Sequence, residues 1–143
     1  MMAIRFKRMF DDAILPFHAD PGSAGYDLSS PVDAIVQPHS MEFIKSGWAV
    51  EIPKGFFGAI YARSGLATHH HVRLANDVGV IDSSYRGQIG LPMFNDGDYP
   101  YIIHRGDRIA QLIIQPYLEF DIKVVDELDQ TERGSSGFGS SGR

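Results

Sequence analysis

The chain has 143 residues, of which 43% are hydrophobic and 22% are charged, a composition typical of a soluble globular protein. Its formal net charge of −5 gives no general affinity for nucleic acid or anionic membranes, and no apolar run approaches the roughly 18 residues of a membrane span. Cysteine is absent, which excludes a disulfide framework, a thiolate nucleophile and a zinc–thiolate cluster. We therefore expect one intracellular, cytoplasmic domain with neither nucleic acid nor a membrane as a partner.

Short apolar or alternating segments, spaced at roughly 8–12 residues, predict an all-β protein. In chain order, the expected strands cover residues 4–7, 24–28, 32–36, 41–52, 56–61, 74–78, 88–94, 99–103, 108–115 and 117–125. Ser64 is a suitable N-cap, so one short helical turn is expected at residues 64–68. This pattern is typical of a sandwich, a barrel or a jelly roll.

The composition changes after residue 125, and we expect a β domain over residues 1–125 followed by a flexible arm over residues 126–143. Residues 137–142 match G-x-G-x-x-G, but no βαβ unit surrounds them, so a dinucleotide-binding fold is rejected. A plain linker is the simpler interpretation of this arm. However, glycine N–H groups and serine hydroxyls can surround phosphate oxygens, while Arg133 can pair with them and Phe138 can stack on a base.

Residues 79–87 (GVIDSSYRG) run from two apolar residues into an acid, a two-serine turn, an aromatic residue and a base. With residues 74–78 and 88–94 they predict a β-hairpin whose tip carries Asp82 and Tyr85. Taken alone, the stretch is more typical of a hairpin with a solvated Asp than of a functional site. Residues 69–71 are three consecutive histidines; because neighbouring strand residues point to opposite sides, we do not predict a metal site there.

Five stretches, in order along nearly the whole chain, resemble the motifs of the trimeric dUTP pyrophosphatases (dUTPases). They cover residues 24–28, 63–67, 79–87, 106–112 and 133–142. The resemblance implies a jelly-roll subunit in a homotrimer with active sites at subunit interfaces. One subunit would contribute the third motif, a neighbour the first, second and fourth, and the remaining subunit the arm. The implied reaction is Mg²⁺-dependent hydrolysis of dUTP to dUMP and pyrophosphate, which keeps uracil out of DNA and supplies dUMP for thymidylate synthesis.

The resemblance also implies a role for each matching residue. Asp82 would activate the water that attacks the α-phosphorus, and Tyr85 would pack under the deoxyribose. Uracil would be read around Asn76, Gly79, Val80, Ile81 and Gly90. Phosphate contacts would come from Arg63, Ser64, Gly65 and Gln111. The arm would close on the nucleotide through Arg133, Phe138, Gly139, Ser140 and Ser141. Asp27 and Arg108 would support the site, and Mg²⁺ would be held by substrate phosphates and water rather than by the protein.

Two other functions stay open for such a chain. A dCTP deaminase of the same superfamily would also need an acid that activates water, but those enzymes lack this complete glycine- and serine-rich arm. A nucleotide-binding regulatory trimer would not need Asp82 or Tyr85, and both are present. A purely structural jelly roll would have no use for the arm.

Overall fold

The computed structural model describes residues 3–137, which contain ten strands and one short helix. The strands are β1 (Arg5–Arg8), β2 (Tyr26–Ser29), β3 (Ala34–Val36), β4 (Met41–Glu51), β5 (Phe56–Ala62), β6 (Val72–Leu74), β7 (Gly79–Ile81), β8 (Gln88–Asn95), β9 (Tyr101–Ile103) and β10 (Arg108–Pro116). The helix is α1 (Ser64–His70). These elements confirm the all-β prediction.

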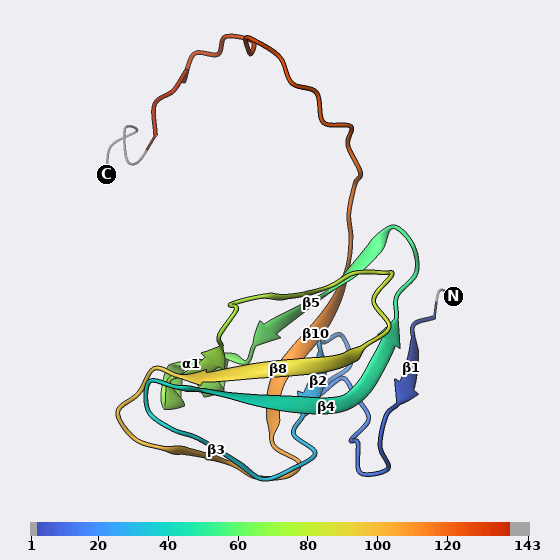
Figure 1. Cartoon of the computed structure of the whole chain (residues 1–143), viewed down its shortest axis with the longest axis vertical. Coiled ribbons are helices and arrows are strands. Elements are labelled where there is room, and N and C mark those ends of the chain that lie inside the picture. Colours follow the sequence, from blue (N-terminus) through green and yellow to red (C-terminus); the bar gives the residue numbers. More distant parts are fainter. Residues whose placement is uncertain (1–2, 138–143) are drawn as a thin grey trace.

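Two four-stranded antiparallel sheets, with strand orders β1-β4-β8-β6 and β2-β10-β5-β7, form the body, and β3 pairs with β9 (Figure 1). A single apolar core draws residues from both large sheets. In strand β8, buried and partly buried residues alternate. Ile89, Leu91 and Met93 therefore enter the core, while Gly90 lies on the outer face of the sheet. No helix of the described residues is long and apolar enough to cross a membrane.

The expected hairpin around residues 79–87 is wrong in its pairing. β6 pairs with β8, but β7 pairs with β5, which belongs to the other large sheet. The chain leaves β6 through a turn in which Asp77 adopts a left-handed backbone (φ 58°) and its carboxylate accepts a hydrogen bond from Arg73 (2.9 Å). Because this turn redirects the chain, residues 79–81 leave the sheet that contains β6 and extend the other large sheet as its edge strand.

The strand expected over residues 117–125 is also wrong, because no strand follows β10 in the described chain. A strand needs a hydrogen-bonding partner, and this segment leaves the body without one (Figure 1). Its alternating apolar residues are largely exposed: Leu118 79%, Phe120 80%, Ile122 95% and Val124 97%. Residues 117–125 are therefore grouped with the predicted arm of residues 126–143, and from here on "the arm" means residues 117–143.

Helix α1 differs from its prediction in two ways. Arg63, in extended conformation, occupies the N-cap position without a side-chain cap, and Ser64 is the first helical residue. The helix runs to His70, and His71 ends it in a left-handed conformation (φ 58°), so the three histidines do not alternate along a strand. The capping prediction is wrong because the helix begins one residue earlier than expected, and the Arg63 guanidinium, which has only N–H donors, cannot cap the first backbone N–H groups.

Candidate active site

A buried carboxylate joins three of the five motif stretches. Asp27 of β2 is 6% exposed, and its Oδ1 lies 3.1 Å from Nε of Arg63 while its Oδ2 accepts a hydrogen bond from Nη1 of Arg108 (3.0 Å). Arg63 also donates from Nη1 to the carbonyl of Arg108 (3.2 Å). Because β10 lies between β2 and β5, one carboxylate holds the ends of three neighbouring strands together.

Replacing Asp27 by Asn should destabilise the fold measurably. Removing a charged hydrogen-bond acceptor from two guanidinium groups is expected to lower the free energy of unfolding by about 1.5–3 kcal/mol, measured by urea denaturation. The matched control is Asp98→Asn, because the Asp98 side chain is 85% exposed and its pair with His39 lies on the surface. That control should change stability by no more than about 0.5 kcal/mol. Equal effects of the two substitutions would contradict this account.

The same strand ends enclose a polar cavity of about 330 Å³. It is lined by Ala19, Ser23, Ala24, Gly25, Asp27, Arg63, Ser64, Gly65 and Gln111. Two arginines and one carboxylate leave a local excess of one positive charge beside it. An anion can therefore be held here although the whole chain is acidic.

Gln111 is oriented by the backbone around the cavity. Its Nε2 donates to the carbonyl of Ala62 (3.0 Å), which leaves the amide oxygen directed toward Gly25. A Cβ added at Gly25 would lie 2.6 Å from that oxygen, so a larger residue here would displace the Gln111 amide. A backbone carbonyl thus satisfies the amide N–H of this strand glutamine.

Asp82 and Tyr85 lie together on the turn that follows β7. The N–H of Tyr85 donates to the carbonyl of Asp82 (3.0 Å), which closes the predicted two-serine turn. The Tyr85 hydroxyl donates to the carbonyl of Gln88 (3.1 Å), and its ring covers Gly87. Both side chains are exposed, so Asp82 presents its carboxylate to solvent from a turn of fixed shape.

Tyr117, the first residue of the arm, lies close to this turn. Its N–H donates to the carbonyl of Gly55 (3.1 Å) and its ring packs edge-on against Phe57. A hydrogen bond to Glu119 is the main cause that raises the pKa of Tyr117, and the nearby charge of Asp82 adds to the effect. The arm therefore leaves the body beside the turn that carries Asp82. The sequence did not indicate this neighbourhood.

The backbone of Gly90 has an open side. Lys45 of β4 lies opposite Gly90, and on the other side of β8 the N–H of Ala75 donates to the carbonyl of Pro92 (2.7 Å). Because backbone groups of alternate residues face the same neighbour, the N–H and C=O of Gly90 face the β6 side. β6 ends at Leu74, so no strand of the described chain covers this position. Asn76 follows in the adjoining turn, with its Nδ2 3.6 Å from where a Cβ of Gly79 would lie.

The predicted residues thus fall into separate groups. The polar cavity is lined by Asp27, Arg63, Ser64, Gly65 and Gln111, and Arg108 is paired with Asp27 beside it. The third-motif residues lie on and around β7 and β8, and none of them lines that cavity. Arg133 lies in the arm and donates to the carbonyl of Ser136 (2.9 Å). Phe138, Gly139, Ser140 and Ser141 lie outside the described residues.

The donor set suits a metal that arrives with a ligand better than a metal held by the protein. Among residues 3–137, no group of three or more His, Asp or Glu side chains is arranged to hold a metal ion. Asp27 is the acid at the polar cavity, and two arginines already occupy its oxygens. An ion at this site would therefore need oxygen ligands from a bound phosphate and from water.

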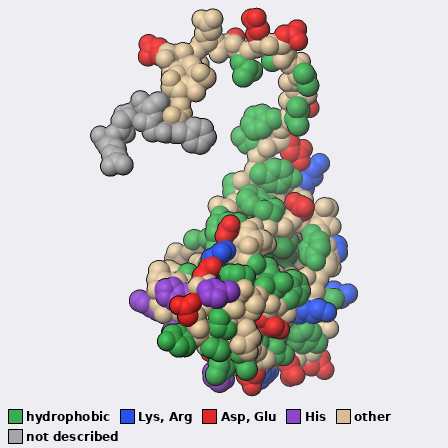
Figure 2. All heavy atoms as spheres, turned by 60° about the vertical axis from the view of Figure 1, so that its left-hand side comes forward, with side chains coloured by type: hydrophobic (Ala, Val, Ile, Leu, Met, Phe, Trp, Pro, Cys, Tyr) green, Lys and Arg blue, Asp and Glu red, His purple; other side chains and the backbone are tan. Residues whose placement is uncertain are grey.

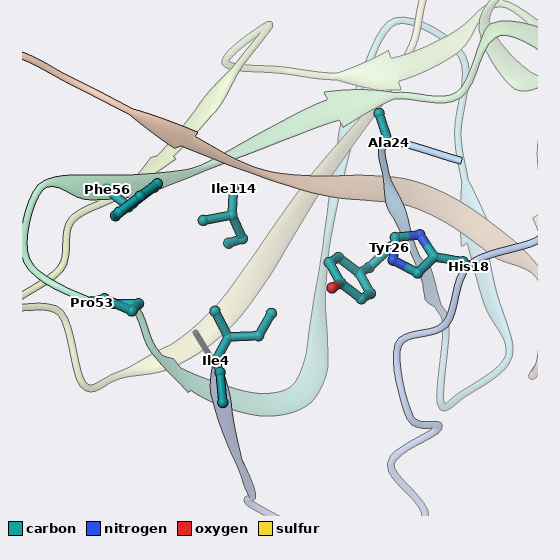
Figure 3. A pocket seen from close by; sticks show the side chains of 8 residues that line it. Ile4, His18, Ala24, Tyr26, Pro53, Phe56 and Ile114 are labelled. Carbon is teal, nitrogen blue, oxygen red and sulfur yellow. The ribbon is translucent and has the colours of Figure 1, made fainter. Parts of the chain in front are cut away.

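A second pocket, of about 510 Å³, is mostly apolar and lies on the other side of β2 (Figure 3). Its lining includes Ile4, Tyr26, Phe56 and Ile114, and His18 lies against Tyr26 with ring centroids 3.9 Å apart. The nearby edge strand β1 is basic, with Arg5, Lys7 and Arg8. The apolar lining and the basic strand are complementary to a segment that carries apolar and acidic side chains.

The family model, the relatives by sequence and the solved structures described here all indicate the same family. The sequence model of the dUTPase family matches residues 11–142. The deoxyuridine 5'-triphosphate nucleotidohydrolase of Syntrophotalea carbinolica is 41% identical over 143 residues, covering 99% of this chain and 97% of that protein. The mouse (Mus musculus) enzyme of the same name is 40% identical over 141 residues, covering 99% and 86%.

Solved structures agree with the sequence comparison. The dUTPase of Staphylococcus bacteriophage 80alpha with dUPNHPP superposes with a TM-score of 0.92 at 31% identity, covering 100% of both chains. A mutant dUTPase from phage phi11 of S. aureus, described with a coordinated structural Mg(II) ion, gives a TM-score of 0.81 at 26% identity. It covers 88% of this chain and 98% of that one.

Proposed function

The chain belongs to the dUTPase family and is a dUTP diphosphatase, and from this premise we propose how its residues divide the reaction. Asp82 acts as the general base that deprotonates a water molecule. That water attacks the α-phosphorus of dUTP in line with the leaving pyrophosphate. One observation carries the assignment: the Asp82 carboxylate is exposed, and a hydrogen bond from Tyr85 closes the turn on which it lies. A general base must reach water in a fixed orientation, and such a turn provides it.

The polar cavity is proposed as the phosphate site. Arg63 and Arg108 supply positive charge there, and their shared partner Asp27 keeps both guanidinium groups in place. Ser64, Gly65 and the oriented amide of Gln111 offer further donors around a space of about 330 Å³. Charge and hydrogen-bond donors fixed in this way would stabilise the negative charge that develops on the leaving pyrophosphate.

The backbone around β7 and β8 is proposed as the uracil site. Because β7 is an edge strand, those backbone groups of Gly79, Val80 and Ile81 that do not bond β5 can face a base. The open side of Gly90 can offer its N–H and C=O as well, with Asn76 adjacent. Such a site rejects a base whose edge leaves these groups unpaired. Tyr85, exposed beside them, would pack against a deoxyribose and leave no space for a 2′-hydroxyl.

Mg²⁺ is the proposed cofactor. The mutant phage phi11 dUTPase is described with a structural Mg(II) ion, so a related protein binds this metal, while the donor set of this chain fits an ion carried by the substrate. When bound to the triphosphate, Mg²⁺ would neutralise phosphate charge. The arginines that Asp27 orients would then hold the remaining charge.

A homotrimer is the proposed assembly, with residues 126–143 closing over a neighbouring active site. The single chain brings the first, second and fourth motifs together but leaves the third apart, which supports a site completed by another copy. The arm supports it too, because residues 117–132 carry exposed apolar side chains together with six acids and one lysine (Figure 2). The apolar pocket beside basic β1 in a second copy offers a surface of complementary character (Figure 3).

Pyrophosphate release tests the proposal directly. With Mg²⁺ present, dUTP should be hydrolysed, while dTTP, dCTP and UTP should each react at least about 10²-fold more slowly. An excess of EDTA should remove most of the activity, and added Mg²⁺ should restore it. Release of ammonia from dCTP would instead indicate the deaminase. A protein that binds dUTP without turnover would indicate a nucleotide-dependent regulator.

The biological setting follows from the reaction. Hydrolysis of dUTP inside the cell, which we propose as the compartment, would keep uracil out of DNA. The dUMP that is formed is the precursor for thymidylate synthesis.

A further inference from the structure

Phe43 lies on β4 and covers Gly90, a contact that no local sequence pattern indicates. In the β4–β8 register, Phe43 is opposite Pro92 and Lys45 is opposite Gly90, so all four lie on the outer face of the sheet. The Phe43 ring leans along the sheet. A Cβ added at Gly90 would lie 2.8 Å from Cε1 and 2.9 Å from Cε2 of this ring, with Cζ closer still. The ring therefore fills the place that a side chain at position 90 would occupy.

The ring remains 53% exposed, so about half of it packs against the sheet and the rest faces solvent. Burial alone does not account for it, because a smaller apolar residue could cover the strand with less exposed surface. What the ring does supply is a rigid contact for a glycine. Glycine in a strand has no side chain to pack and moves more freely than other residues. An aromatic neighbour on the adjacent strand restores the missing packing.

The contact with Phe43 is important because the residue that it covers, Gly90, belongs to the proposed uracil site. Gly90 is the position on β8 whose N–H and C=O face the side that β6 leaves open. Backbone donors and acceptors read a base only if they stay in place, because an error of about 1 Å is enough to lose a large part of the interaction. A contact that restrains Gly90 therefore also restrains the base-reading edge.

We propose that Phe43 is a positioning residue for uracil recognition, which holds the backbone of Gly90 in register and closes the outer face of the base site. The inference rests on the proposed uracil site at Gly90. It does not involve the phosphate site or Asp82. Losing the ring should consequently weaken the binding of dUTP without slowing the chemical step.

The test compares Phe43→Ala with Met41→Ala in the full-length enzyme. Met41 is the matched control because it lies two residues earlier on the same strand, is 50% exposed, and faces Phe94 instead of Gly90. Phe43→Ala should raise KM for dUTP about tenfold with kcat within twofold of wild type, and should raise the relative rate with dTTP. Met41→Ala should leave KM unchanged, and Phe43→Tyr, which keeps the ring, should restore it.

A second pair of variants separates positioning from stability. Gly90→Ala should lower Tm in the wild-type background, because its Cβ meets the Phe43 ring, but should be tolerated in the Phe43→Ala background. KM should stay high in the double variant, since space is regained but the restraint is not. Equal KM values for Phe43→Ala and Met41→Ala in an active enzyme would overturn this inference alone. A wild-type chain that does not hydrolyse dUTP would instead overturn the proposed function, and the inference with it.

Discussion

Asp82→Asn is expected to hydrolyse dUTP about 10²–10⁴-fold more slowly than the wild-type chain, the range usual for loss of a general base. An amide cannot take up the proton of the attacking water. The turn itself should persist, because the backbone carbonyl of Asp82, and not its side chain, accepts the hydrogen bond from Tyr85. Pyrophosphate release under saturating dUTP and Mg²⁺ measures the loss in kcat, and binding of a non-hydrolysable dUTP analogue checks that affinity is kept.

Asp77→Asn is the matched control for this experiment. Asp77 is an exposed acid on the same connection between β6 and β8, and asparagine tolerates its left-handed backbone. The substitution weakens an exposed pair with Arg73, which is worth at most about 1 kcal/mol. Its kcat should stay within twofold of wild type. If Asp82→Asn kept more than a tenth of the wild-type kcat, another group would have to be the base.

Shortening the arm is expected to have the second large effect, and two end points separate its two roles. A chain that ends at Glu132 keeps the apolar segment but lacks the residues proposed to close over the nucleotide. Its kcat/KM for dUTP should fall about 10²-fold, because the triphosphate is no longer held and shielded from water, while the assembly should stay intact. A chain that ends at Pro116 should lose both activity and assembly, as measured by light scattering after size-exclusion chromatography.

Substitutions inside the arm test the assembly role without removing chain. Ile122 is 95% exposed in the single chain, so Ile122→Ser would be neutral if the arm stayed in solvent. If the arm packs on another copy, the loss of one buried apolar side chain should weaken assembly by about 1.5–3 kcal/mol for each arm. Lys123→Ser, which changes the neighbouring charged residue, is the control and should have little effect. Equal behaviour of the two variants would contradict the docked arm.

Much of the fold follows from local pattern. Expected strands over residues 4–7, 41–52 and 56–61 correspond closely to β1, β4 and β5, because alternation and turn residues are local signals. Strand pairing is a different matter. Residues 79–81 pair with β5 and not with β8, and nothing in their own sequence distinguishes these two partners. Residues 117–125 have the alternation of a strand but no strand beside them in the single chain.

The candidate site divides in the same way. Asp27, Arg63, Arg108 and Gln111 are far apart along the chain, and the sequence identified them only by their resemblance to family motifs. That Asp27 holds both arginines, and that Gln111 binds a backbone carbonyl, depends on the β2–β10–β5 order. The contact between Phe43 and Gly90 had no local signal beyond an aromatic residue on a strand.

By itself, the sequence determined the all-β class, the turn that carries Asp82 and Tyr85, and the dUTPase family, because these depend on residue types and their spacing. Tertiary structure alone decided which strands are neighbours, which charges meet and which glycine needs an aromatic cover. These depend on distances between segments remote in sequence, which are set when two sheets close on one core. The same reasoning applies to the arm: its alternating apolar residues are exposed in the single chain, and the surface on which they would pack in the proposed trimer is set by tertiary structure and not by local pattern.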